Sequence, residues 1–565
     1  MLVPKDNIIG VILSGATTSE AICQLHESAE KGGVKESMLV LIKSQERKIL
    51  ARISQLIPFN AFYTEGDAWS EARRKGLPIP EDIARKYEIC KLDLLIEIPR
   101  SDVKAPPQPG DPVIRIDPKQ HLKEIFGVSQ DDPKHIWIGT LSGYEKDLLP
   151  VPLYIENITM HIAIFGVTGS GKSFTTGALI EKLTNIPVKN NAHVSYPMVI
   201  IDAHGDYIDY AEYVANNNNL GRAKWVKRYV FPKAYSQFYF RSSKHIHPIG
   251  INLDLIPLRE LAEIIILFYK GSLEGAELQI NHLEEYLEYM LKEKGYSNIQ
   301  NLFIKYYDDL ERGLEEFASE RDIHPSTKAA IFRALRSFKT TIEDQHKLLS
   351  SSSELKEVEE DMGSKKIKFV ESITREGGIA IFDFSAEGAP GVDLRTKQFV
   401  MTYLTTLLFE QFTQYKMKKE DRYLLLIIEE AQNFCPDKTY PVGYSLAHTK
   451  LSTIATQGRK FGLSLCLISQ RPSFVDRVVL SMCNTFFIHR TSPEDVSFVK
   501  AVCGGLPSSL ASRLTMLNTG DVIITGQLVP VPFPLLVHIL DSDRKIKHTV
   551  GKTNISDRLA ELQGV

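Results

Sequence analysis

Apolar and polar positions divide the chain into two stretches with different periodicity. Across residues 1–145, short apolar runs such as IIGVILSG, MLVLIKS, KILARISQL and KLDLLIEIP are separated by Gly, Pro and polar turns, and PQPGDPVIRI adds a further turn. Runs of this length between turn residues are typical of β-strands. We therefore expect a small β-barrel or sandwich here, with a charged helical or loop insertion at 68–87.

From about residue 150, strand-like runs alternate with helical stretches, which indicates a doubly wound α/β core. The expected strands are HIAIF, MVIID, GIAIFDF, YLLLII, LSLCLIS, TFFIHR and DVIITG. Between the second and third of these, residues 257–368 carry Leu, Glu, Lys and Tyr at helical spacing, which predicts an inserted helical subdomain. We expect its last part, SSSSELKEVEEDMGSKK, to be an exposed linker.

These changes of pattern define five expected segments. They are a β-barrel-like domain at 1–145, the α/β core at 146–256 and 369–545, the helical subdomain at 257–368 and a C-terminal tail at 546–565. The net charge of −3 excludes a globally basic surface, so any contact with nucleic acid depends on a local patch or a pore.

Cysteine usage and hydropathy indicate the compartment. The six cysteines form no CxxC pair, and several lie inside apolar runs, as buried thiols do in a reducing cytoplasm. The N-terminus lacks the pattern of a signal peptide, and no apolar run approaches the roughly 20 residues that span a bilayer. We expect a cytoplasmic protein without membrane association.

Residues 166–173, GVTGSGKS, fit the phosphate-loop pattern G-x-x-x-x-G-K-[ST] between an apolar strand and a helix. The glycines let backbone N–H groups point inward, and the helix adds its positive N-terminal end. Lys172 can reach the β- and γ-phosphates, and the Ser173 hydroxyl can coordinate Mg²⁺. The absence of an [NT]KxD element favours ATP over GTP. The expected nucleotide-binding residues are Gly166, Thr168, Gly169, Ser170, Gly171, Lys172, Ser173 and Phe174.

Two acidic residues follow the continuous apolar run of YLLLIIEEAQNF, which predicts a buried central strand. Ligands bind at that end of an open α/β sheet. We assign Glu430 as the base that activates water and Glu429 to the metal shell. The alternative is a pair of exposed acids that start a helix.

Further polar residues follow other expected strands. In MVIIDAHGDY, Asp202 and His204 could position Mg²⁺ or water, although His204 could equally be a capped turn residue. Gln470 ends the strand LSLCLIS and suits a γ-phosphate sensor, while Arg459 suits a finger in a neighbour's site or a cation at a helix C-terminus. Arg490 is either a second sensor or a surface charge.

Contacts with DNA have two candidate segments. One is GRAKWVKRYVFPK, which mixes basic and aromatic residues, although a solvated edge strand explains it at least as well. The other is the loop DKTYPVGYSLAHTK, with Lys438 and Lys450. The basic and aromatic residues of the first segment are Arg222, Lys224, Trp225, Lys227 and Arg228.

Taken in order, HIAIFGVTGSGKS, IIDAHGDY, LIIEEAQNF, GRKFGLSLCLISQRPS, CNTFFIHR and LNTGDVIITG resemble the HerA branch of the HerA/FtsK superfamily of ring-shaped DNA-translocating ATPases. The resemblance covers roughly residues 136–545, and IGVILSG and PGDPVIRI are similar in pattern to the family's N-terminal β-barrel. It implies a RecA-like core, a homohexamer with ATP between subunits, and double-stranded DNA in a central pore.

The resemblance also implies roles and partners. Lys172 and Ser173 hold phosphate and Mg²⁺, Glu430 is the catalytic base, Gln470 the sensor and Arg459 the trans finger. The implied partner is a nuclease or a sirtuin-like NAD-cleaving effector, in DNA-end processing or antiviral defence.

The chain departs from the family pattern at several positions. Ala203 and Asp206 stand where the family usually has Pro and Glu, and Gln432 where it commonly has His. The shorter side chain of Asp206 weakens any carboxylate role there. The tail KIKHTVGKTN is loosely similar to a basic tail that can touch a neighbour's nucleotide.

The leading hypothesis is an ATP-driven hexameric DNA translocase or helicase that works with an effector. The alternative is a scaffold ATPase whose ring assembles and regulates the effector, with translocation secondary. A secretion or conjugation ATPase is a third option, but it would normally bring transmembrane helices.

Overall fold

The computed structural model describes residues 7–30, 33–66, 69–78, 86–99, 101–129, 131–145, 148–188, 192–216, 222–237, 244–272, 274–361, 364–441 and 443–544. The tail KIKHTVGKTN lies outside these residues. The chain forms two compact units. The first comprises Met1–Tyr154, Leu506–Arg513 and Gly520–Leu540, and the second Ile155–Gly505, Leu514–Thr519 and Asp541–Val565.

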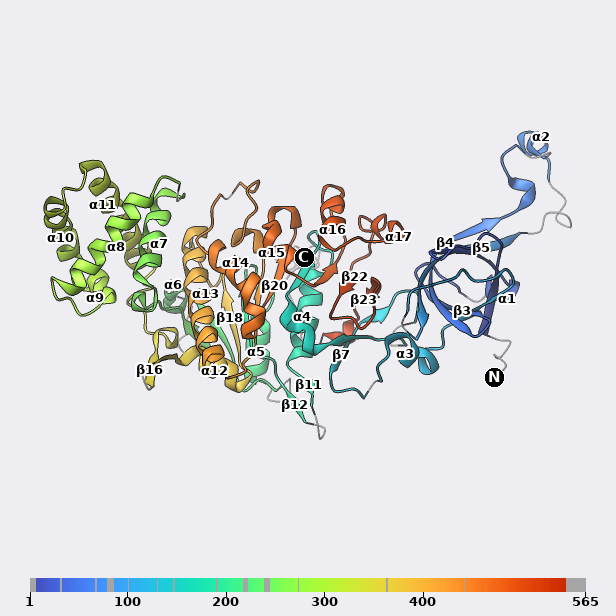
Figure 1. Cartoon of the computed structure of the whole chain (residues 1–565), viewed down its shortest axis with the longest axis horizontal. Helices are drawn as coiled ribbons and strands as arrows, with labels where there is room; N and C mark the ends of the chain where they lie inside the picture. The colour runs from blue at the N-terminus through green and yellow to red at the C-terminus, as the bar shows by residue number, and fades with distance from the viewer. Residues whose placement is uncertain are drawn as a thin grey trace, which may run out of the picture. The chain divides into compact units, whose positions relative to one another are not determined.

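Six antiparallel strands at the start of the first unit close a barrel in the order β1-β2-β5-β4-β3-β6 (Figure 1). Along β2, Ala21, Cys23 and Leu25 are buried and alternate with more exposed residues, as the wall of a small barrel requires. The expected barrel is confirmed, although β2 itself was not expected. The strands are β1 (Ile8–Ile12), β2 (Glu20–Leu25), β3 (Leu39–Ser44), β4 (Arg47–Phe59), β5 (Tyr87–Ile98) and β6 (Pro112–Arg115).

The rest of the first unit consists of short strands and helices. The expected strand DVIITG is β22 (Asp521–Gly526), which pairs antiparallel with β23 (Leu535–His538), and β23 pairs with β8 (Thr140–Leu141). Strand β22 therefore belongs to the first unit, together with the N-terminal residues, and not to the α/β core in which the sequence placed it. The other elements are α1 (Glu27–Glu30), α2 (Ser70–Arg74), α3 (Pro118–Phe126), β7 (His135–Ile138), β9 (Val151–Tyr154) and α17 (Ser508–Ala511).

A fully parallel run of strands forms the centre of the second unit, in the order β15-β14-β18-β13-β19-β20-β10-β21. The expected α/β core is thus confirmed. Its central strands are buried along their whole length, which explains their continuous apolar sequences. The strands are β10 (Ile162–Phe165), β13 (Met198–Asp202), β14 (Val226–Val230), β15 (Ile246–Pro248), β18 (Ile379–Asp383), β19 (Leu424–Ile428), β20 (Leu463–Ser469) and β21 (Thr485–Ile488).

Helices connect these parallel strands. No helix in the described parts of the chain is long and apolar enough to cross a membrane. The connecting helices are α4 (Lys172–Leu183), α5 (Ile208–Asn216), α6 (Pro232–Gln237), α12 (Lys368–Glu376), α13 (Leu394–Met417), α14 (His448–Gln457) and α15 (Arg477–Ser481). Helix α16 (Val496–Val502) follows the last parallel strand, and a small hairpin pairs β11 (Ile186–Pro187) with β12 (His193–Val194).

The expected helical insertion is present between β15 and β18 and forms a separate group of helices, α7–α11, in Figure 1. The segment expected to be an exposed linker is instead structured, because Leu355 is buried and Glu354 pairs with Lys227. It continues into a hairpin of β16 (Val358–Asp361) and β17 (Ser364–Ile367). The helices are α7 (Leu258–Lys270), α8 (Glu277–Lys292), α9 (Ile299–Ile304), α10 (Tyr307–Glu320) and α11 (Pro325–Lys339).

Candidate active site

The predicted site residues meet at the carboxyl edge of the parallel strands. Strand β20 lies between β10, which leads into the phosphate loop, and β19, which leads into Glu429 and Glu430. On the other side of β19, β13 ends at Asp202. Since all four strands run in the same direction, their ends form one row of polar groups, the usual place for a ligand in an open α/β sheet.

The phosphate loop has the backbone that its glycines permit. Gly171 caps α4 in the left-handed region (φ 105°), which L side chains rarely adopt. At Gly166, a Cβ atom would lie 2.6 Å from the Ser170 hydroxyl and 2.6 Å from Cβ of His489, so no larger residue fits. The loop is fixed further because Val167 donates its N–H to the carbonyl of Arg490 at 2.8 Å.

Lys172 and Ser173 are the first two residues of α4, so both lie at the positive end of that helix. The Lys172 ammonium is largely buried and donates to the Val167 carbonyl at 3.1 Å. Burial lowers the pKa of Lys172, while Glu430, Glu429 and Asp206 oppose that shift. A cation held beside N–H groups in this way suits the phosphates of ATP, so the residues present fit the nucleotide.

Glu429 and Asp202 are buried carboxyl groups close to each other. Burial raises the pKa of Glu429 well above its usual value, and Asp202 and Asp206 raise it further. Burial likewise raises the pKa of Asp202 to about 6. A divalent cation beside Glu429 would favour its charged form, so this donor fits Mg²⁺.

Asp202 has its oxygens occupied by the chain itself. Oδ1 accepts backbone N–H groups from residues 204, 205 and 206 at 3.3, 2.7 and 2.9 Å, and Oδ2 accepts that of Tyr207 at 2.8 Å. These bonds shape the turn after β13. The geometry therefore favours a structural role for Asp202 over the metal role expected from the sequence.

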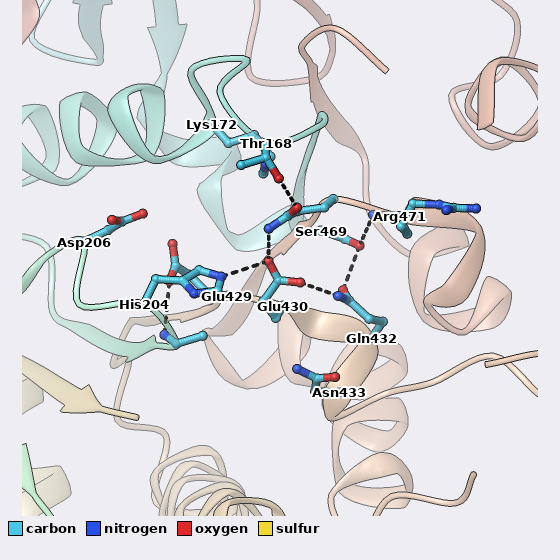
Figure 2. Close-up of polar contacts among 12 residues, drawn as sticks. Thr168, Lys172, His204, Asp206, Glu429, Glu430, Gln432, Asn433, Ser469 and Arg471 are labelled. Atoms are coloured by element: carbon cyan, nitrogen blue, oxygen red, sulfur yellow. Dashed lines mark hydrogen bonds and ion pairs between the residues drawn. The ribbon is translucent and has the colours of Figure 1, made fainter. Parts of the chain in front are cut away.

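Glu430 lies beside the phosphate-loop residues Thr168 and Lys172 (Figure 2). It is linked to the loop through Gln470. The Gln470 amide donates to Oε1 of Glu430 at 2.6 Å, and its carbonyl oxygen accepts from the Thr168 hydroxyl at 2.5 Å. Gln470 follows β20, the strand beside β19, as expected for a sensor. One amide side chain thus joins the expected base to the nucleotide-binding loop.

Two further side chains contact Glu430. His204 Nε2 lies 3.1 Å from Oε1, and the Gln432 amide donates to Oε2. Although burial works against it, the hydrogen bonds from His204, Gln432 and Gln470 lower the pKa of Glu430. The bond to Glu430 raises the pKa of His204. Sequence reasoning missed the contact of Gln432, whose only signal was its departure from the family pattern.

Arg459 is not brought to this site within the chain. It is exposed and lies in the turn at 458–461, just before β20 begins at Leu463. Because β20 ends at the site, Arg459 lies at the opposite edge of the sheet, roughly 20 Å away along the strand. Arg490 supports the phosphate loop through its carbonyl, and its sensor role stays a prediction.

The segment GRAKWVKRYVFPK is largely part of the fold rather than a DNA-binding surface. It contains β14, which is covered on one side by β15 and on the other by β18. Trp225 Nε1 donates to Glu376 at 2.7 Å, and Lys227 pairs with Glu354 at 2.7 Å. Arg222 and Lys224 are exposed.

Arg228 is buried completely within the second unit. Its side chain is 1% exposed and its Nη2 lies 2.6 Å from Oδ2 of Asp383, which is fully buried, and 2.8 Å from Oε1 of Glu387. A DNA contact by Arg228, one candidate from the sequence, is therefore wrong. The alternative of a solvated edge strand is wrong as well, because Arg228 is buried and β14 lies between two other strands. In the second candidate segment, Lys450 pairs with Glu260 at 2.9 Å and Lys438 is exposed.

Comparison with known proteins supports the family suggested by the motifs. The sequence model described as "Helicase HerA, central domain" matches residues 136–408. The "DNA double-strand break repair helicase HerA" of Sulfurisphaera tokodaii is 24% identical over 543 residues, which are 93% of this chain and 92% of that protein. The protein of the same name from Saccharolobus solfataricus is 24% identical over 571 residues, 98% of both chains.

Among solved structures, VirB4 of Thermoanaerobacter pseudethanolicus matches 74% of this chain and 100% of its own, with 14% identity and a TM-score of 0.45. That likeness is too weak to support a functional conclusion. The match to the HerA central domain and the relatives along nearly the whole chain agree with the complete phosphate loop and its linked glutamate. The chain is thus an ATP hydrolase whose residues 136–408 match the central domain of HerA helicases and which is similar to them along nearly its whole length.

Proposed function

We propose that the chain hydrolyses ATP to drive double-stranded DNA through the pore of a homohexameric ring. The proposal rests on two hydrogen bonds, from Thr168 to Gln470 and from Gln470 to Glu430, which connect the phosphate loop to the expected base. Relatives named as DNA double-strand break repair helicases along nearly the whole chain support the choice of DNA.

In this proposal each residue has one task at the nucleotide. Lys172 and the N–H groups of the phosphate loop bind the phosphates. Ser173 and Glu429 would hold Mg²⁺, which supplies charge to stabilise the phosphoryl group when bound. Glu430 takes a proton from the attacking water as the bond from the terminal phosphorus to its bridging oxygen breaks.

The position of Arg459 supports sites shared between subunits. An exposed arginine at the sheet edge opposite its own phosphate loop cannot reach its own nucleotide, but it can reach a neighbour's in a ring. There it would stabilise the charge that develops in the transition state.

The loop 437–441 is the proposed DNA contact. Lys438 is exposed on it, and Tyr440 donates to Asn433 at 3.1 Å, close to the catalytic segment. Six copies of one exposed lysine around a channel would concentrate positive charge on DNA although the chain itself carries a net charge of −3.

We further propose a partner enzyme, either a nuclease or a sirtuin-like NAD-cleaving protein, in DNA-end processing or antiviral defence. This part is supported by the family resemblance alone. The identity of the neighbouring gene distinguishes the two kinds of partner.

The decisive measurement is steady-state ATP hydrolysis with and without double-stranded DNA. We expect DNA to stimulate hydrolysis several-fold in the wild type and Glu430→Gln to abolish turnover while nucleotide binding persists. Hydrolysis that ignores DNA but responds to the partner would overturn translocation and support the scaffold alternative.

A further inference from the structure

The backbone at Glu430 is held in a conformation that its side chain must help to maintain. Its φ of +47° lies in the left-handed region, and it caps the short turn at Ala431–Asn433 directly after β19. A non-glycine residue there is strained and persists only where its surroundings fix it. The side-chain contacts of Glu430 are therefore part of what aims its carboxylate.

Each oxygen of the Glu430 carboxylate has a donor outside the phosphate loop. Figure 2 shows the carboxylate between His204 and Gln432. His204 Nε2 lies 3.1 Å from Oε1, and the Gln432 amide donates to Oε2. A carboxylate held at both oxygens by groups from different segments keeps both its position and its plane.

Gln432 is itself fixed by a second bond. Its carbonyl oxygen accepts from the Ser469 hydroxyl at 2.8 Å, and that hydroxyl accepts the N–H of Arg471 at 3.1 Å. Both Gln432 and Ser469 are buried. Since the Ser469 hydroxyl requires an acceptor on this side, the amide of Gln432 is turned with its NH₂ toward Glu430.

Gln470, the third donor, is in a different situation. Its two polar atoms bridge Thr168 and Glu430, and its amide carries a second hydrogen with which it can contact a γ-phosphate. The contacts of His204 and Gln432 involve no residue of the phosphate loop. They therefore hold Glu430 independently of Gln470 and of the loop.

We infer that His204 and Gln432 are positioning residues that hold the Glu430 carboxylate in line for the attacking water, independently of the phosphate loop. The inference rests on the proposed role of Glu430 as the base. Gln432 carries the larger share, because it is buried and fixed by Ser469, whereas the His204 side chain is half exposed.

The test compares kcat and KM for ATP in variants of the full chain. Gln432→Met keeps the side-chain length but removes the donor, and we expect kcat to fall about 10- to 100-fold with KM within about twofold of the wild type. Gln432→His, which keeps a donor, should retain most of kcat. His204→Ala, at an exposed position where folding is not at risk, should lower kcat less, about 3- to 10-fold.

Two controls separate positioning from a merely structural effect. Gln411→Met makes the same substitution at another buried glutamine, which accepts the N–H of Ile367 and belongs to α13, and kcat should be unchanged. The second control is the recovery of kcat in Gln432→His relative to Gln432→Met at unchanged KM, which a merely structural loss would not give. Equal losses in Gln432→Met and Gln432→His, or full activity in Gln432→Met and His204→Ala, would overturn the inference.

If the proposed function were wrong, the same variants would give a different set of hydrolysis rates. If Glu430→Gln alone retained wild-type hydrolysis, the base assignment would be wrong and this inference would fall with it. If Glu430→Gln were inactive while both positioning variants kept full kcat, the inference alone would be wrong.

Discussion

Replacing Arg228 with Met should destabilise the second unit without a direct effect on DNA binding. In the folded chain the Arg228 guanidinium donates from Nε and Nη2 to one oxygen of Asp383, at 3.0 and 2.6 Å. Arg228 is 1% exposed and Asp383 is fully buried. Methionine fills much of the space of the arginine stem but leaves the Asp383 carboxylate buried without its cation.

The expected loss follows from that burial. Removing one partner of a buried ion pair costs about 3–5 kcal/mol, because the remaining charge has neither water nor a counter-ion. We take about 3 kcal/mol, since Asp383 still accepts the N–H of Ser385 at 2.9 Å. For the roughly 350 residues from Ile155 to Gly505, an unfolding entropy of about 2.1 cal/mol/K per residue converts this to a drop in Tm of about 4 °C.

The assay is calorimetric unfolding together with DNA binding at fixed salt. Arg228→Met/Asp383→Asn should recover most of the lost stability, because the uncompensated charge is gone. Lys224→Ala, an exposed change in the same segment, is the matched control and should leave Tm unchanged. An Arg228→Met variant with unchanged Tm but weakened DNA binding would refute the reasoning.

Three further predictions address the site and the turn that leads to β20. Lys172→Ala should abolish nucleotide binding, and unchanged affinity in a calorimetric titration would contradict the phosphate-loop assignment. Arg459→Ala should preserve binding but lower turnover about a thousandfold; mixing it with Glu430→Gln subunits should restore some activity, and no recovery in any mixture would count against a trans finger. Gly462→Ala places Cβ 1.9 Å from a backbone carbonyl oxygen and should lower the free energy of unfolding, measured by thermal unfolding, by at least about 2 kcal/mol. Gly443→Ala, which has open space around the new Cβ, should lower it by only about 1 kcal/mol. Equal losses in the two variants would exclude the clash.

The core strands could be predicted because they are buried on both faces, which produces continuous apolar runs such as LLLII in β19. Strand β14 carries Lys227 and Arg228, whose charges are balanced by Glu354 and Asp383, 127 and 155 residues away along the chain. No residue near β14 in the sequence indicates these ion pairs. In β2, Ile22 points outward and is 37% exposed, which obscures the alternation that defines the barrel wall.

The sequence predicted those parts of the site in which a characteristic residue type stands at a characteristic spacing. The phosphate loop, Glu430 and Gln470 follow from strand ends that the parallel sheet brings together. The contact of Gln432 was not predictable, because it depends on the left-handed turn at Glu430. The turn bonds of Asp202 were equally hidden, since any aspartate after a strand can serve a metal or its own backbone.

The attachment point of the helical insertion has a practical consequence for studying this ATPase. The insertion follows β15, which ends the strand order six steps from β10, or roughly 30 Å at the usual strand spacing. The exposed turn around Gly295, between α8 and α9, belongs to that insertion. A fluorophore or affinity handle placed there would report on assembly of the proposed ring without disturbing the nucleotide loop.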